Sequence, residues 1–199
     1  MNLPNKITIS RICLIPVFGI IFFLDMIPYN YFIAALVFII AACTDFIDGH
    51  IARKYNLVTN LGKFLDPIAD KVLVSTALIF VLVKPEIITV LWGSWTMIYA
   101  GVCVAVILAR ELIVSGFRMV AASTGLVLAA DKVGKVKTTF QDIAIAMLLA
   151  GANFFDIVKA SEVINAIGIV CLGIATVLTI WSGLSYIVKN KAVFRQSES

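Results

Sequence analysis

Long apolar runs alternate with short polar stretches along most of this 199-residue chain. A helix that crosses a membrane needs about 20 predominantly apolar residues, and runs of roughly that length with few charges predict such helices. These runs lie at residues 12–27, 30–52, 66–83, 87–117, 134–153 and 163–188. A more polar, amphipathic segment at residues 2–10 precedes the first run. We therefore predict an all-α, polytopic membrane protein, a bundle of six transmembrane helices with a short N-terminal amphipathic segment, in one domain over residues 1–199.

The overall composition supports a membrane protein. Hydrophobic residues make up 61% of the chain and charged residues 14%, with a mean hydropathy of +1.04. A soluble domain typically carries about 25% charged residues, so this composition argues against that class. We expect membrane lipid as a partner, and no nucleic acid.

Basic residues gather at one set of helix ends. Of the 16 Lys and Arg residues, all but Lys84 and Lys159 fall near the N-terminus, the C-terminus, or the ends of the second to fifth runs on the same side. Under the positive-inside rule, this asymmetry predicts that both termini are cytosolic. It also requires an even number of spans, in agreement with six. We see no cleavable signal peptide, and we expect a multi-pass protein of a bacterial cell membrane.

Four aspartates interrupt the apolar pattern between residues 45 and 70. Asp45 and Asp48 are three residues apart, and Asp66 and Asp70 are four apart, so each pair shares one face of a helix. Pro67 suits the first turn of the third helix. The connection between the second and third helices is short enough to bring the two pairs face to face at their cytosolic ends.

Carboxylates so close together repel one another unless protons, basic side chains or divalent cations neutralise them. Oxygen ligands favour Mg²⁺, Mn²⁺ or Ca²⁺ over zinc. Two such ions about 3.5–4 Å apart would clamp a pyrophosphate and its leaving oxygen. The alternative is a solvated helix end where the aspartates form salt bridges with nearby Lys and Arg residues.

Small residues beside the aspartates fit a ligand site. Gly49 and Ala52 fall on or next to the face of the first pair, and Gly62 lies at the entrance to the third helix. Small side chains let a ligand approach the backbone. Arg53 follows one turn after Gly49 and is suited to bidentate binding of a phosphate.

The stretch from Asp45 to Asp70 reads D-x-x-D-G-x-x-A-R, eight residues, then G-x-x-x-D-x-x-x-D. It resembles the signature of the CDP-alcohol phosphatidyltransferases, a family of six-helix membrane homodimers. The resemblance implies that the first three aspartates bind Mg²⁺ or Mn²⁺, two ions per site, and that Asp70 contributes to the metal site and serves as the base. It also implies a CDP-binding set of Gly49, Ala52, Arg53 and Gly62.

Two further regions extend the resemblance. "PNKITISR" is similar to the N-terminal element of the family and implies that Asn5, Thr8 and Arg11 lie near the nucleotide. "LARELIVSGFRMVAA" and "GKVKTTFQ" resemble the phosphatidylglycerophosphate synthase branch. That branch implies transfer of the phosphatidyl group from CDP-diacylglycerol to sn-glycerol 3-phosphate, with release of CMP, in phospholipid biosynthesis.

Basic residues near the cytosolic ends of the fourth and fifth helices suit an acceptor that carries a phosphate. Arg110 stands out because a charge within an apolar helix needs a partner or a purpose. Its neighbour Glu111 is one candidate partner, although adjacent residues on a helix do not face each other. For Lys132 and Lys137, attraction to lipid headgroups or a role in topology explains the charge equally well. The residues we favour for the acceptor phosphate are Arg110, Arg118 and Lys135, with Lys63 as a further candidate.

Other functions remain open at this point. An intramembrane prenyltransferase also uses aspartates and Mg²⁺, but it would normally carry acidic clusters on two distant helices. A cation transporter would place its acids near the bilayer midplane, often beside broken helices. Within the family, the acceptor could instead be inositol phosphate or another alcohol; the basic pocket disfavours serine.

Overall fold

The computed structural model describes residues 3–54, 60–88, 93–123, 132–152 and 158–189, apart from some side chains near helix ends. Every regular element in these ranges is an α-helix, which confirms the predicted all-α class for the described part of the chain. The helices are α1 (Leu3–Phe23), α2 (Asn30–Lys54), α3 (Asn60–Val83), α4 (Pro85–Ile88), α5 (Ser94–Ser123), α6 (Lys132–Gly151) and α7 (Val158–Lys189).

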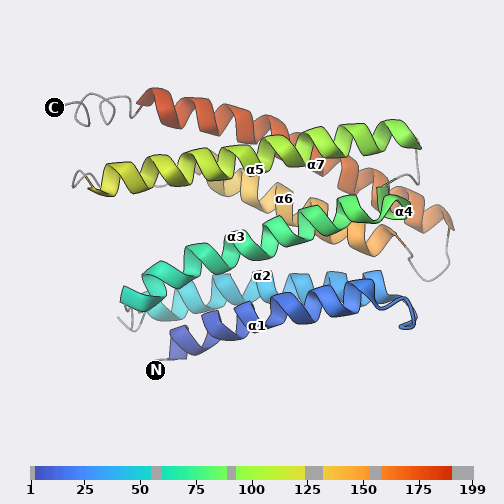
Figure 1. Ribbon diagram of the computed structural model, residues 1–199, viewed down its shortest axis with the longest axis horizontal. Coiled ribbons are helices and arrows are strands. Elements are labelled where there is room, and N and C mark those ends of the chain that lie inside the picture. The colour runs from blue at the N-terminus through green and yellow to red at the C-terminus, as the bar shows by residue number, and fades with distance from the viewer. Residues whose placement is uncertain (1–2, 55–59, 89–92, 124–131, 153–157, 190–199) are drawn as a thin grey trace.

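The six long helices run back and forth along one axis (Figure 1). The start of α1, the end of α2, the start of α3, the end of α5, the start of α6 and the end of α7 lie together at one end of the bundle. We call this the basic end, because the predicted concentration of Lys and Arg falls there. Lys84 and Lys159 lie at the opposite end, between α3 and α4 and at the start of α7.

Helix α6 holds the two halves of the bundle together. On one side α1 packs against α2 and α3, and on the other α5 packs against α7. Helix α6 makes its most extensive contact with α7, and it also contacts α2 and α3. It therefore lies between the halves, with its N-terminal part at the basic end (Figure 1).

Two segments are long and apolar enough to cross a membrane by length and composition: Ser94–Met119 in α5 and Lys159–Lys189 in α7. Shorter apolar stretches, Thr8–Phe23 and Asn30–Thr44, lie in α1 and α2. The described residues thus confirm that the protein is helical and that several of its helices are apolar. That six helices cross the membrane stays a prediction.

Three predicted boundaries were wrong. The N-terminal amphipathic segment and the first apolar run form one continuous helix, α1. Pro4 does not interrupt this helix, because it falls in the first turn, where a missing N–H costs no hydrogen bond. Helix α3 begins at Asn60, so Pro67 lies beyond its first turn. The predicted 87–117 segment is divided between α4 and α5, which starts directly after Gly93. Gly93 has φ = 58°, a backbone conformation that favours glycine.

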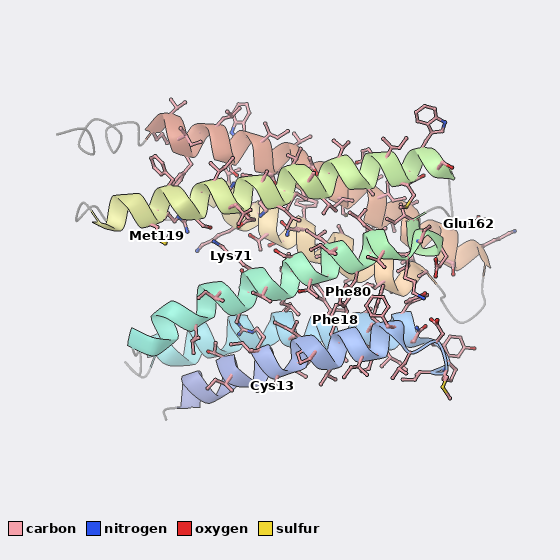
Figure 2. All side chains as sticks on the ribbon, viewed as in Figure 1. Cys13, Phe18, Lys71, Phe80, Met119 and Glu162 are labelled. Carbon is pink, nitrogen blue, oxygen red and sulfur yellow. The ribbon has the colours of Figure 1, made fainter. Side chains whose placement is uncertain are left out.

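An aromatic cluster joins α1 to α3 in the core. The rings of Phe18 and Phe80 stack with centroids 5.6 Å apart, and Figure 2 shows them between the two helices. Phe22 lies 5.2 Å from Phe80 and is fully buried. Close van der Waals packing of these rings holds α1 against α3.

A polar cluster closes the end opposite the basic end. The Lys84 ammonium lies 3.2 Å from Asp25 and 3.8 Å from Glu86, and Tyr31 donates a 2.9 Å hydrogen bond to Glu86. The hydrogen bond to Asp25 raises the pKa of Lys84. These contacts connect the turn after α1 with α2 and with the junction of α3 and α4.

Helices α6 and α7 approach closely at Gly151. A Cβ atom there would lie 2.8 Å from the backbone nitrogen of Asn165, which cannot move aside as a flexible side chain could. We predict that Gly151→Ala lowers the free energy of unfolding by about 1–3 kcal/mol through overpacking. Thermal unfolding of the purified protein in detergent measures the effect.

The matched control is Gly101→Ala in the middle of α5, where an added Cβ would meet nothing within 4 Å. This control should be neutral or stabilising by up to about 1 kcal/mol, because alanine favours helix. Equal destabilisation by both substitutions would contradict the packing argument.

Candidate active site

The backbone brings the predicted aspartate pairs to the same end of the bundle. Helix α2 carries Asp45 and Asp48 in its C-terminal part, and α3 carries Asp66 and Asp70 in its N-terminal part. The two helices pack against each other, with these parts at the basic end (Figure 1). The helical spacing gives each pair a common face. The predicted residues whose side chains lie outside the described set are Asn5, Asp45, Asp48, Gly49, Ala52, Arg53, Gly62, Lys63 and Asp66.

Of the three residues that the N-terminal motif predicts near the nucleotide, Thr8 and Arg11 have described side chains, and both face inward. Thr8 is 1% exposed and Arg11 is fully buried. They are three residues apart on α1, so they share the face that packs against α2 and α3. A buried guanidinium is costly unless it is paired. We therefore infer that the Arg11 side chain interacts inside the bundle rather than with lipid headgroups.

A small cavity of about 40 Å³ opens beside Asp70, where α3, α5 and α6 converge. Polar and charged side chains dominate its wall. The lining residues are Asp70, Lys71, Val74, Ser75, Leu108, Glu111, Lys137, Thr138 and Gln141. Asp70 thus lines the same cavity as Lys71, Lys137 and Glu111.

Glu111 is the centre of the charge network beside this cavity. Its Oε1 atom lies 2.5 Å from Lys137 Nζ and 3.3 Å from Arg110 Nη1. The Lys137 side chain is 4% exposed and the Glu111 side chain 22% exposed, so water screens the pair weakly. A half-buried carboxylate between two cations holds α5 to α6 at this point.

Lys71 ties α3 to the same region. Its ammonium donates a hydrogen bond to Ser115 Oγ, and Ser115 in turn donates one to the backbone carbonyl of Glu111, at 2.5 Å. Figure 2 shows Lys71 reaching from α3 toward α5. Glu111 and Lys71 together therefore fix α3, α5 and α6 around the cavity.

Three of the residues predicted for the acceptor phosphate have described side chains, Arg110, Arg118 and Lys135, and none of the three lines this cavity. Arg110 donates a 3.0 Å hydrogen bond to Ser182, and Arg118 donates one of 3.2 Å to Tyr186 and lies over its ring. Both guanidinium groups thus contact α7. Lys135 is exposed on α6. Glu111, the candidate partner of Arg110 in the sequence analysis, does contact it, with Arg110 Nη1 3.3 Å from Glu111 Oε1.

Lys137 and Lys71 line the cavity with Asp70, but neither was among the residues favoured for the acceptor phosphate from the sequence. The helical period of α6 does indicate that Lys137 is buried. Lys137, Gln141, Ala144, Ile145 and Leu148 are all buried and recur every three or four residues. In contrast, residues 135, 139 and 143 share the exposed face. The period predicts that Lys137 points inward and Lys135 outward.

The donor set at the ends of α2 and α3 fits a hard divalent cation. Four carboxylates match the oxygen ligands that Mg²⁺ and Mn²⁺ prefer, and His50 also lies in this stretch of α2. Among the described side chains, no group of three His, Cys, Asp or Glu residues is placed to hold a metal.

Comparison with known proteins agrees with this geometry. The family model described as CDP-alcohol phosphatidyltransferase matches residues 1–181. The chain belongs to the CDP-alcohol phosphatidyltransferase family. As a member, it is a transferase of phosphatidyl groups.

Relatives within the family match nearly the whole chain. A Bacillus subtilis protein named CDP-diacylglycerol–glycerol-3-phosphate 3-phosphatidyltransferase is 43% identical, with 98% of both chains covered. Proteins with the same name from Rickettsia bellii and Escherichia coli K12 are 39% and 38% identical, with 97% and 96% of both chains covered.

The charge network predicts that removing Glu111 destabilises the protein more than removing Lys137. Glu111→Gln leaves both Lys137 and Arg110 without their carboxylate, and we expect a loss of about 2 kcal/mol or more in unfolding free energy. Lys137→Met should cost less, because Glu111 keeps Arg110. Thermal unfolding of both single variants and of the double variant measures the coupling.

The double variant should lose less stability than the sum of the two single variants, since the buried charges are removed together. Strict additivity would show that the 2.5 Å contact between Glu111 and Lys137 contributes nothing to the fold.

Proposed function

We propose that this protein transfers the phosphatidyl group of CDP-diacylglycerol to sn-glycerol 3-phosphate, yielding phosphatidylglycerophosphate and CMP. The observation that carries the proposal is the near-full-length identity with relatives that bear the name of this reaction. The cavity beside Asp70 is a second support. It combines a carboxylate with the ammonium groups of Lys71 and Lys137, as an acceptor with a hydroxyl and a phosphate requires.

In the proposed reaction, the primary hydroxyl oxygen of the acceptor forms a bond to the phosphorus that carries diacylglycerol. The bond from that phosphorus to the bridging oxygen breaks, and CMP leaves with the electron pair. Asp70 accepts the hydroxyl proton as the new bond forms. A carboxylate is a suitable base here because a neutral primary alcohol is a poor nucleophile.

The proposed metal ligands are Asp45, Asp48, Asp66 and Asp70, which would hold two Mg²⁺ or Mn²⁺ ions. Such ions would neutralise part of the negative charge on the two phosphates. For CDP we propose the residues implied by the family motif: Asn5, Thr8, Arg11, Gly49, Ala52, Arg53 and Gly62. The burial of Thr8 and Arg11 on the inner face of α1 supports their part in this set.

For the acceptor phosphate we propose the sequence-derived set of Lys63, Arg110, Arg118 and Lys135, and we add the two cavity lysines. Lys137 and Lys71 share the cavity with Asp70, whereas Arg110 is connected to it through Glu111. We further propose a homodimer in a bacterial cell membrane, with six spans and the basic end in the cytosol. The asymmetry of Lys and Arg supports this orientation.

A CMP-release assay tests the proposed reaction. Purified protein receives CDP-diacylglycerol and Mg²⁺ or Mn²⁺, with glycerol 3-phosphate, inositol phosphate or serine in separate reactions. We expect CMP release with glycerol 3-phosphate, and its loss when a chelator removes the divalent cation. Release with inositol phosphate alone would retain the chemistry and overturn the acceptor. No release with any acceptor, from folded protein, would overturn the proposed function.

Asp70→Asn tests the base. Removing a general base typically costs about 10²–10⁴-fold in rate, so we expect kcat to fall by that order while CDP-diacylglycerol still binds. Turnover is measured by CMP release, and binding by displacement of labelled CDP-lipid.

The matched control for this substitution is Asp25→Asn, at the opposite end of the bundle, where Asp25 pairs with Lys84. Its turnover should stay within about twofold of the unmodified protein. Loss of CDP-lipid binding together with turnover in Asp70→Asn would assign Asp70 to ground-state binding instead.

A further inference from the structure

Gln141 places a buried hydrogen-bond acceptor in the wall of the cavity beside Asp70. The side chain is 2% exposed and lines the cavity. Its Oε1 atom is buried and has no hydrogen-bond partner within the described part of the chain. Leaving a buried polar atom without a partner costs about 1–3 kcal/mol of folding free energy. A ligand that donates a hydrogen bond to this oxygen would remove that cost.

Several other polar groups around the cavity already have partners. The Lys137 ammonium is held by Glu111, the Lys71 ammonium by Ser115, and the Thr138 hydroxyl donates a 2.8 Å hydrogen bond to the carbonyl of Gly134. None of these contacts involves the Gln141 oxygen. Because Gln141 lines the cavity, its amide lies beside any donor that enters there.

The proposed acceptor brings such a donor. In sn-glycerol 3-phosphate, the secondary hydroxyl is on the carbon next to the one that carries the reacting primary hydroxyl. Adjacent hydroxyl oxygens lie only about 3 Å apart, a hydrogen-bond length. When the primary hydroxyl is at Asp70, the secondary hydroxyl must therefore lie in the same cavity. A hydroxyl can both donate and accept, so it suits an amide side chain.

We propose that Gln141 is a specificity-determining residue that accepts a hydrogen bond from the secondary hydroxyl of the acceptor. The inference rests on the proposed function, because it takes glycerol 3-phosphate as the acceptor. Gln141 recognises the hydroxyl that does not react and orients the neighbouring primary hydroxyl toward Asp70. A site built to bind a hydroxyl discriminates against an analogue that lacks it, since the buried polar group is then left unpaired.

The test compares two acceptors in the CMP-release assay with the full chain. One is glycerol 3-phosphate, and the other is 3-hydroxypropyl phosphate, which keeps the primary hydroxyl and the phosphate but lacks the secondary hydroxyl. The unmodified protein should prefer glycerol 3-phosphate in kcat/KM by roughly tenfold or more. Gln141→Met, which has a similar shape and no amide, should reduce this preference to within about twofold.

The selectivity ratio separates recognition from a structural role. Gln141→Met should lower kcat/KM for glycerol 3-phosphate and leave that for 3-hydroxypropyl phosphate nearly unchanged. Gln141→Glu, which retains an acceptor oxygen, should restore part of the preference. The matched control is Thr139→Val, an exposed position two residues away on α6, which should keep the ratio of the unmodified protein.

Two results would overturn the inference while the proposed function stands. The first is an equal loss of activity with both acceptors in Gln141→Met, as expected if the amide only supports the fold. The second is an unchanged ratio, as expected if the amide only binds a trapped water. Failure of the unmodified protein to use glycerol 3-phosphate at all would instead refute the proposed function, and the inference would fall with it.

Discussion

The ion pair between Glu111 and Lys137 is the interaction on which the basic end of this bundle depends. Charged groups inside an apolar helical bundle are costly unless they are paired, and the Lys137 side chain is only 4% exposed. Glu111 neutralises it at 2.5 Å and also contacts Arg110. The requirement for charge compensation thus links α5 to α6 through the side chains of Glu111 and Lys137.

The same network determines where the cavity lies. Lys71 reaches Ser115, and Ser115 is bonded to the backbone of Glu111, so α3 is held in register with α5. Asp70 and Lys71 both line the cavity between these helices, together with Lys137. The two ammonium groups are held there by their contacts with Ser115 and Glu111, and they supply positive potential to the cavity.

Close packing on the far side of α6 supports the site. Helix α6 makes its most extensive contact with α7, and Gly151 lets the α7 backbone approach within a distance that a Cβ atom would not allow. Arg110 and Arg118 on α5 also contact α7 at the basic end, through Ser182 and Tyr186. The two arginines therefore contribute to positioning α7, and the burial of Lys137 and Gln141 follows from how tightly α6 is enclosed.

The sequence by itself determined the helical class, the family and the aspartate motif. Apolar runs of membrane-spanning length fix helices, and the spacing from Asp45 to Asp70 is local, so it is readable without a fold. Helix limits were less accurate where the backbone changes direction at Gly93. The partners of the basic residues were decided by the tertiary structure. The period of α6 separates an inward Lys137 from an outward Lys135, but the partner of each cation depends on how the helices pack. Glu111 with Lys137 and Arg110 with Ser182 are contacts between distant parts of the chain, so the sequence alone does not give them.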